Sequence, residues 1–263
     1  MTQTLQSTED CEAYDTLAPF YDTFTAHHDY ELWTGALLRL ARAHGLTGNR
    51  LLDVGCGTGK SFLPFVRMGW RVTACDVSAR MLEIAADKAP ADVELHVADA
   101  RELPNLGEFD LVLLLDDVVN YLTQADDLIG ALAAAAANLA PDGVLLFDAN
   151  TLLTYRTFFA ETLVVEADDC YLVWRGDTPA DAEPSVLAVG VLDAFARGAD
   201  GSWARHPSVH RQRHHTDSAV RAALADAGLE CVAVYGQGYD ARPVAGADHL
   251  GDTKALYIAR RGA

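Results

Sequence analysis

The chain has 263 residues, half of them hydrophobic, which is enough for one large α/β domain or for such a domain with a modest second lobe. Its 38 acidic and 20 basic residues give a formal charge of −18, which would repel a phosphate backbone, so no nucleic-acid partner is expected. No apolar run reaches the length of about 18 residues that a membrane-spanning helix needs, and the polar, acidic opening segment lacks the features of an export signal, so we expect no membrane association and a cytoplasmic location.

Alternating strands and helices make up the first part of the chain. Two helices are predicted over residues 13–47, and the first is rich in aromatic side chains. From Arg50 onward the pattern predicts strands at 50–54, 71–76, 94–98, 111–115 and 144–148, with helices at 61–68, 79–89 and 125–139. Because these strands are almost continuously apolar, helices are expected to cover both faces of their sheet. The sequence therefore predicts a Rossmann-like α/β fold with a mostly parallel, doubly wound sheet.

The pattern changes after Asn150. Short alternating segments at 162–166, 171–175, 186–195 and 208–215 predict a small antiparallel β lid. A helix at 217–227 and strands at 230–236 and 255–260 follow, and they can complete the core sheet. We therefore expect three parts: residues 1–150 with the N-terminal helices and the ligand-binding core, residues 151–215 with the lid and a substrate-binding insertion, and residues 216–263 with the C-terminal helix and strands.

A glycine-rich turn lies between the first predicted strand and the helix after it. In the run Leu51–Gly59 (LLDVGCGTG), the glycines allow the backbone to approach a ligand closely at the carboxyl edge of the sheet. About 20 residues further on, Asp76 ends the second strand, where its carboxylate can accept hydrogen bonds from both hydroxyls of a ribose. Lys60 stands where the dinucleotide pattern G-x-G-x-x-G requires glycine, so NAD and FAD are disfavoured. The arrangement indicates an adenosine-containing ligand.

Two more motifs follow in chain order, Asp99–Ala100 after the third strand and Leu115–Asp117 after the fourth. Together with the glycine-rich turn and Asp76, they resemble the motifs of the class I S-adenosylmethionine-dependent methyltransferases. The resemblance implies that the turn lies beside the methionine moiety, that Asp76 holds the ribose and that Asp99 binds the adenine amino group. The implied cofactor is S-adenosyl-L-methionine, and the residues implied to bind it are Asp53, Gly55, Gly57, Gly59, Asp76, Val77, Met81, Asp99, Ala100, Leu115 and Asp116.

The N-terminal segment carries a further motif, Tyr14-x-x-x-Ala18-x-x-Tyr21-Asp22, followed by Trp33. It resembles a bacterial branch of these enzymes whose leading helices fold over the cofactor, which implies that Tyr14, Tyr21 and Trp33 line its methionine end. Aromatic ring faces attract a sulfonium cation, so this placement is chemically reasonable. The alternative, that these rings only form the core of an amphipathic helix, stays open for each of them.

Candidate substrate residues come from two regions. The segment after the fourth strand and the lid resemble the same branch, and they supply Asn120, Tyr121, Tyr171 and Trp174. In the run His210–His215, strand alternation places His210, Gln212 and His214 on one face and Arg211, Arg213 and His215 on the other, and one face should meet the active site. A metal site is disfavoured because three alternate residues of a strand spread over about 13 Å. The predicted substrate-binding residues are Asn120, Tyr121, Tyr171, Trp174, Arg211 and Arg213.

Methyl transfer is an in-line displacement in which the protein mainly aligns the acceptor with the methyl carbon. A hydroxyl acceptor would benefit from a base, and His210 or His214 is the preferred candidate because an imidazole titrates near neutrality. An amine acceptor would instead be attracted by Asp116 and Asp117. We therefore predict a methyltransferase acting on an N or O nucleophile of a small molecule, with His210, His214 and Asp117 as catalytic candidates. A nicotinamide-dependent oxidoreductase, a non-catalytic S-adenosylmethionine-binding protein and a homodimeric assembly stay open.

Overall fold

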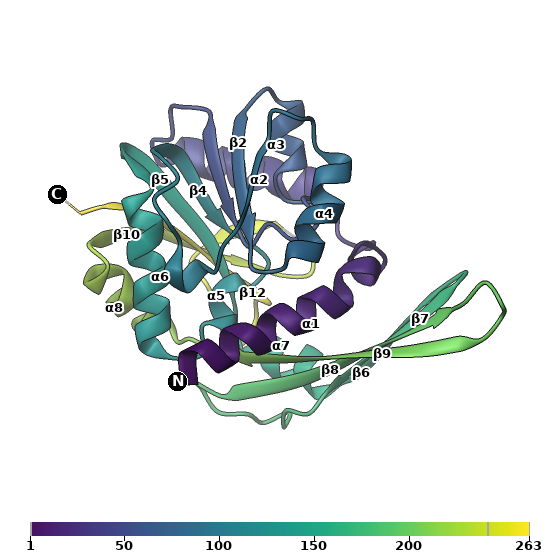
Figure 1. Cartoon of the computed structure of the whole chain (residues 1–263). Coiled ribbons are helices and arrows are strands. Elements are labelled where there is room, and N and C mark those ends of the chain that lie inside the picture. Colours follow the sequence, from purple (N-terminus) through teal and green to yellow (C-terminus); the bar gives the residue numbers. More distant parts are fainter. Residues whose placement is uncertain (1, 241, 263) are drawn as a thin grey trace.

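The computed structural model describes residues 2–240 and 242–262, with side chains from Thr8 onward. Its core is an eight-stranded sheet with the order β11-β10-β12-β5-β4-β1-β2-β3 (Figure 1). The neighbours from β5 to β3 pair in parallel, and β12, β10 and β11 add antiparallel pairs at the other edge. The predicted Rossmann-like α/β class is thereby confirmed. The strands are β1 (Arg50–Val54), β2 (Arg71–Asp76), β3 (Glu94–Val97), β4 (Phe109–Leu114), β5 (Leu139–Asn150), β10 (Leu229–Gln237), β11 (Pro243–Ala245) and β12 (Lys254–Arg261).

Helices cover both faces of this sheet. Successive residues of β1 point to opposite faces, so Leu51 packs in the cluster that contains α2 (Tyr30–Ala43), α3 (Leu63–Arg67) and α4 (Ala79–Lys88), whereas Leu52 packs against α6 (Ala125–Ala137) and α8 (Asp217–Asp226). This double burial is the physical reason that the central strands are apolar on both sides. The polar ends of the parallel strands, by contrast, are left at one edge of the sheet.

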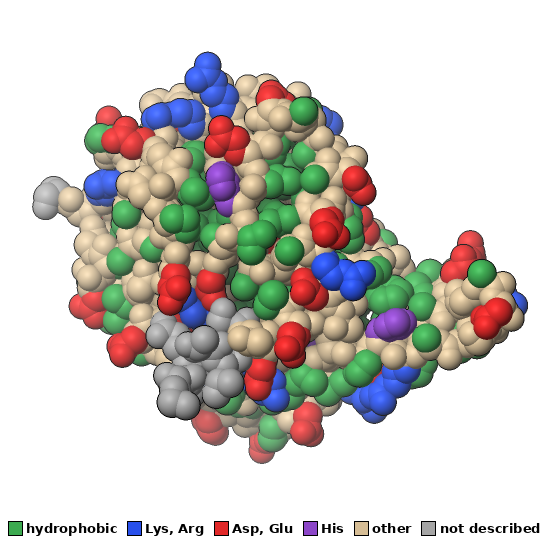
Figure 2. All heavy atoms as spheres, viewed as in Figure 1, with side chains coloured by type: hydrophobic (Ala, Val, Ile, Leu, Met, Phe, Trp, Pro, Cys, Tyr) green, Lys and Arg blue, Asp and Glu red, His purple; other side chains and the backbone are tan. Residues whose placement is uncertain are grey.

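A second sheet forms the lid. Its four antiparallel strands are β6 (Thr162–Ala167), β7 (Cys170–Gly176), β8 (Leu187–Arg197) and β9 (Trp203–Arg213), in that order. Two short helices, α7 (Leu152–Arg156) and η2 (Phe158–Ala160), connect it to β5. The strands β7, β8 and β9 extend away from the core as a long arm, on which acidic side chains are scattered as they are on the core (Figures 1 and 2).

The first helix, α1 (Thr2–Phe24), lies between the core and the lid (Figure 1). Leu17 of α1 packs with Tyr155, Leu172 and Trp174 in a third hydrophobic cluster that joins the helix to the inner face of the lid. The helix begins well before residue 13, where the sequence pattern first predicts it. Four short helices were not predicted: η1 (Ala100–Glu102), α5 (Val118–Tyr121), α7 and η2. Among the residues described, no helix is long and apolar enough to cross a membrane.

Candidate active site

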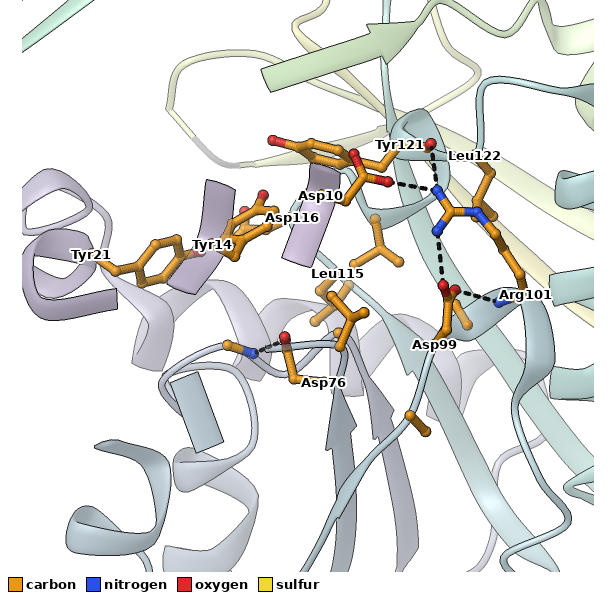
Figure 3. Close-up of a pocket in the computed structure, with 16 residues that line it drawn as sticks. Asp10, Tyr14, Tyr21, Asp76, Asp99, Arg101, Leu115, Asp116, Tyr121 and Leu122 are labelled. Atoms are coloured by element: carbon orange, nitrogen blue, oxygen red, sulfur yellow. Dashed lines mark hydrogen bonds and ion pairs between the residues drawn. The ribbon is translucent and has the colours of Figure 1, made fainter. Parts of the chain in front are cut away.

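A pocket lies at the carboxyl ends of β1, β2 and β4, where α1 covers it (Figure 3). The structure brings most of the predicted cofactor residues into its wall. Those that line it are Tyr14, Tyr21, Gly55, Gly57, Asp76, Val77, Asp99, Ala100, Leu115 and Asp116.

The glycine-rich turn and Asp76 form one hydrogen-bonded unit in this pocket. Gly55 and Gly57 have φ angles of +73° and +53°, in the left-handed region that favours glycine. The Gly57 N–H donates to Asp76 Oδ2 over 2.8 Å, and the Ser78 N–H donates to Oδ1 over 2.9 Å. A carboxylate has about four lone-pair positions, so lone pairs stay available for further donors such as ribose hydroxyls. Burial raises the pKa of Asp76 to about 6, so donors from a ligand would stabilise its ionised form.

At the other end of the pocket, Asp99 is oriented by an arginine. The backbone N–H and Nη1 of Arg101 both donate to the Asp99 carboxylate over 2.9 Å. Nη2 of Arg101 also donates to Asp10 of α1 over 2.6 Å, and Figure 3 shows the three side chains together beside the pocket. Arg101 and Asp10 both line the pocket but were not predicted, because their contact depends on how α1 packs against the core. Burial raises the pKa of Asp10 to about 6 despite this cation.

Four predicted cofactor residues lie outside this pocket wall. Asp53 is buried behind the turn and accepts a hydrogen bond from Ser61 Oγ over 2.5 Å, and burial raises its pKa to about 7. Trp33 is fully buried and donates from Nε1 to Gln237 Oε1 over 2.7 Å, so it packs in the core. Met81 is fully buried in the same way, and a side chain at Gly59 would collide with Phe62.

A second, larger cavity lies between α1, the inner face of the lid and β12. Tyr14, Tyr21, Asp116 and Tyr121 line both cavities, so the two spaces meet at these side chains. A ligand in the first cavity would therefore face an occupant of the second across this junction. Most of the remaining wall is apolar or aromatic, and it includes Leu17, Phe24, Phe158, Phe159, Leu163, Val165, Trp174 and Leu192.

The turn after β4 places the carboxylate of Asp116 at the junction and that of Asp117 in the wall of the second cavity. Asp116 and Asp117 both have φ angles of +59°, which is unusual for residues other than glycine. Their backbone N–H groups donate to the two oxygens of Asp148, over 2.6 and 3.0 Å. Asp117 Oδ2 accepts hydrogen bonds from Gln212 and from Asn150 Nδ2, and burial raises the pKa of Asp117 to about 7. A carboxyl group that changes charge near neutral pH thus lines the second cavity.

Of the two predicted catalytic histidines, only His210 lines the second cavity. Its Nδ1 lies 3.0 Å from the Tyr121 hydroxyl and its Nε2 lies 3.0 Å from Ser208 Oγ, so the fold occupies both ring nitrogens. His214 instead faces Ser185 and His249. Burial lowers the pKa of His210 to about 4, and burial is also the main reason that the pKa of His214 falls to about 4. The expectation that these imidazoles titrate near neutrality is therefore wrong.

Strand alternation in β9 is as predicted, and it is the face with His210 and Gln212 that meets the cavity. Arg211 lies on the opposite face and pairs with Glu9, while Arg213 donates to the carbonyl oxygens of Thr123 and Ser185. Neither arginine lines the cavity, because each is paired elsewhere: Arg211 with α1, and Arg213 with backbone carbonyls.

Of the other four predicted substrate residues, two line the second cavity and two do not. Trp174 and Tyr121 line the second cavity. Tyr171 does not, because it alternates with the inward-facing side chains of β7 and bonds to Glu166 at the surface. Asn120 is buried behind the cavity, where its amide donates to the Arg213 carbonyl and accepts from the Asn150 N–H. Its contacts join the turn after β4 to β5 and β9.

Several cavity residues were not predicted. The aromatic pair Phe158 and Phe159 reaches the wall because η2 turns directly beneath Trp174, whose ring stacks on Phe158 with centroids 4.6 Å apart. Lys254 enters from the start of β12. The adjacent pair of phenylalanines was the only local signal for the first two. Nothing in the local pattern around Lys254 distinguishes it from a surface lysine.

Comparison with known proteins agrees with this geometry. Residues 51–143 match the family described as a methyltransferase domain. A protein of Geobacillus sp. (strain WCH70) that bears a provisional methyltransferase name is 29% identical over 88% of this chain and 94% of its own length. The dTDP-3-amino-3,6-dideoxy-alpha-D-glucopyranose N,N-dimethyltransferase of Streptomyces fradiae is 28% identical over 76% of this chain and 78% of its own length. The crystal structure of an S-adenosylmethionine-dependent methyltransferase from Clostridium acetobutylicum matches with a TM-score of 0.78 at 21% identity, covering 95% of this chain and 99% of that one.

Residues 51–143 thus match a methyltransferase domain, and the fold is shared with S-adenosylmethionine-dependent methyltransferases of known structure. The chain is an S-adenosylmethionine-dependent methyltransferase, so the predicted enzyme class and cofactor are confirmed and the nicotinamide-dependent alternative is set aside. The pocket residues fit this cofactor, because the Asp76 carboxylate and the backbone of the turn at Gly55 and Gly57 both face the pocket.

Proposed function

We propose that this enzyme methylates an amine nitrogen of a small molecule that binds in the second cavity. The observation that supports this most directly is the pair of adjacent carboxylates, Asp116 at the junction of the two cavities and Asp117 in the wall of the second. An aromatic wall surrounds them on the lid side, so a small organic acceptor would lose water as it binds while its nitrogen meets a negative charge.

The charge change in the reaction favours the same acceptor. When bound, S-adenosylmethionine supplies an activated methyl group whose positive charge passes to the acceptor nitrogen on transfer. A carboxylate beside that nitrogen stabilises the developing ammonium ion and can then accept its proton. With its pKa raised to about 7 by burial, Asp117 has the basicity for the second role near neutral pH.

A hydroxyl acceptor is the weaker alternative. It would need a base in contact with the acceptor, and His210, the predicted base that reaches the cavity, has both nitrogens within 3.0 Å of other side chains. The relative from Streptomyces fradiae, whose name describes an N,N-dimethyltransferase of an amino sugar nucleotide, supports the amine.

The assignments within the site are part of this proposal. The wall residues of the first pocket would bind the cofactor, with Asp76 on the ribose and Asp99 on the adenine. Tyr14 and Tyr21, which line both cavities, would flank the sulfonium, as expected for the bacterial branch that the N-terminal motif resembles. The lid, over residues 151–215, would act as the substrate-binding part.

The test is a methylation assay with matched acceptors. The purified protein is incubated with S-adenosylmethionine and a panel containing amino sugar nucleotides, aromatic amines and aliphatic amines, each beside its hydroxyl analogue. Mass spectrometry should find a methylated product from at least one amine and none from its hydroxyl partner. Methylation of hydroxyl analogues alone would overturn the choice of nitrogen. Cofactor binding with no product from any acceptor would favour the non-catalytic alternative.

A further inference from the structure

The turn that carries Asp116 and Asp117 is held in an unfavourable conformation. Two consecutive residues with side chains adopt left-handed backbone angles, which persist only where surrounding contacts impose them. The turn also carries the carboxylates that the proposed function places beside the acceptor. The contacts that hold the turn therefore also set where these carboxylates lie relative to the acceptor.

Asp148 is the group that fixes it. This residue lies on β5, directly beside β4, and its side chain is fully buried. Its Oδ1 accepts the Asp116 N–H and its Oδ2 accepts the Asp117 N–H, so one carboxylate satisfies both amides of the turn. A buried carboxylate held by two amides still needs a balancing cation.

Lys254 supplies that cation from a third strand. It lies at the start of β12, which pairs with β5 in an antiparallel register. Its Nζ donates to Asp148 Oδ2 over 2.6 Å and lies 3.5 Å from Asp116 Oδ1. Lys254 also lines the second cavity, so the ammonium group sits at the edge of the acceptor space.

We propose that Lys254 and Asp148 are positioning residues for methyl transfer: together they hold the turn after β4 so that its carboxylates face the acceptor, and Lys254 supplies the positive charge that balances them. This inference rests on the proposed function, because it assigns the carboxylates to the acceptor amine. It adds two residues that never need to touch the reacting atoms. It also explains why a lysine is buried where β12 meets the site.

The charge environment of Asp117 makes the proposal measurable. The titratable groups that interact most strongly with it come from the turn itself and from five neighbouring elements, and the largest charge effect on Asp117 is that of Lys254. Burial raises the pKa of Asp117, while Lys254 lowers it. Removing the ammonium group should therefore raise this pKa further. The groups are Tyr14, Tyr21, Asp116, Tyr121, Asp148, Tyr155 and Lys254.

The experiment compares three variants with the wild-type enzyme. Lys254→Met removes the cation, Lys254→Arg restores it, and the double variant Lys254→Met with Asp148→Asn removes the pair together so that Asp148 is not left as an unpaired buried charge. Arg260→Met, at the far end of the same strand, is the matched control. Cofactor affinity, kcat, KM and the pH profile of kcat/KM are measured with an amine acceptor that the wild-type enzyme methylates.

We expect cofactor affinity to stay within about twofold, because the turn contributes only one edge of the first pocket. The value of kcat should fall by about 100-fold in Lys254→Met and in the double variant, as is typical when reacting groups are misplaced by about 1 Å. The acidic limb of kcat/KM should move up by about one pH unit in Lys254→Met, and Lys254→Arg should return it toward the wild-type position. The control should leave all four quantities unchanged.

Two results would overturn the inference. An unchanged kcat in the folded double variant would mean that the pair does not position the turn. A lower kcat with an unmoved acidic limb in Lys254→Met would show that the lysine has only a structural role. If Lys254→Met does not fold, kcat of the double variant tests the inference instead. Failure of the proposed function is distinct, because the wild-type enzyme would then methylate no amine at all.

Discussion

The two cavities are built in different ways. The wall of the first comes mostly from one stretch of chain, residues 55–122, in which each segment follows a parallel strand, and α1 completes it. The wall of the second comes from α1, from the turn after β4, from α7 and η2, from four lid strands and from the loops around β11 and β12. The first cavity therefore depends on local chain geometry, whereas the second depends on packing between distant segments.

The walls of the two cavities also differ in the chemical groups that they present. The first presents backbone groups and carboxylates already oriented by neighbours, as Asp76 is by the Gly57 and Ser78 amides. The second presents rings and aliphatic side chains around a few paired polar groups. Changes in the first should weaken one fixed ligand, whereas changes in the second should alter which acceptor is used. Substitutions can test that division.

The largest expected effect is in the first cavity, at Asp76. Replacement by alanine removes both oxygens that would receive the ribose hydroxyls and frees the Gly57 and Ser78 amides. Hydrogen bonds to a charged group contribute about 1.5–3 kcal/mol each, so the affinity for S-adenosylmethionine should fall by about 100-fold or more in calorimetry. The matched control is Asp92→Ala, an exposed acidic residue before β3. Affinity within about threefold of wild type would show that the cofactor binds elsewhere.

A smaller effect, confined to the second cavity, is expected at Gly190. A Cβ built on this glycine of β8 would lie 2.1 Å from the Trp174 ring, so Gly190→Ala should push the indole into the acceptor space. Overpacking of this kind costs about 1–3 kcal/mol, which corresponds to a rise in acceptor KM of about tenfold with cofactor affinity unchanged. Adding Trp174→Phe should restore part of the KM.

The comparison variant for this site is Gly35→Ala on α2, where an added Cβ meets only ordinary contacts. Its KM should equal that of the wild-type enzyme. If Gly190→Ala weakened the cofactor and the acceptor equally, the two cavities would not be separable.

The same division explains how much the sequence predicts. A motif's place after a parallel strand is sufficient to bring Gly55, Asp76 and Asp99 together, because the carboxyl ends of such strands meet at one edge. Asp10 and Arg101 lie in the same pocket, but their contact spans 91 positions in the chain and depends on where α1 rests. No local pattern encodes that placement.

In the lid, the alternation of β9 could be predicted but its orientation could not. The period of two separates Arg211 and Arg213 from His210 and Gln212, yet only the packing of Leu172, Trp174 and Leu192 against α1 determines which set faces inward. Burial has the same non-local origin. It moves the pKa of His210 to about 4, far from the value that an isolated imidazole suggests.

The smallest effect on kcat is expected at His210. A variant at this position tests whether His210 or Asp117 causes the acidic limb of the pH profile. Because burial holds the pKa of this imidazole near 4, the ring is neutral at every pH above about 5, so it cannot cause an acidic limb near neutrality. Asp117, with its pKa raised to about 7, can cause one, since activity that needs the carboxylate is lost as the pH falls through that value. His210→Asn should therefore lower kcat by about threefold, for the lost contact with Tyr121, and leave the limb in place. Asp117→Asn should remove the limb, and disappearance of the limb in His210→Asn instead would make the histidine the base.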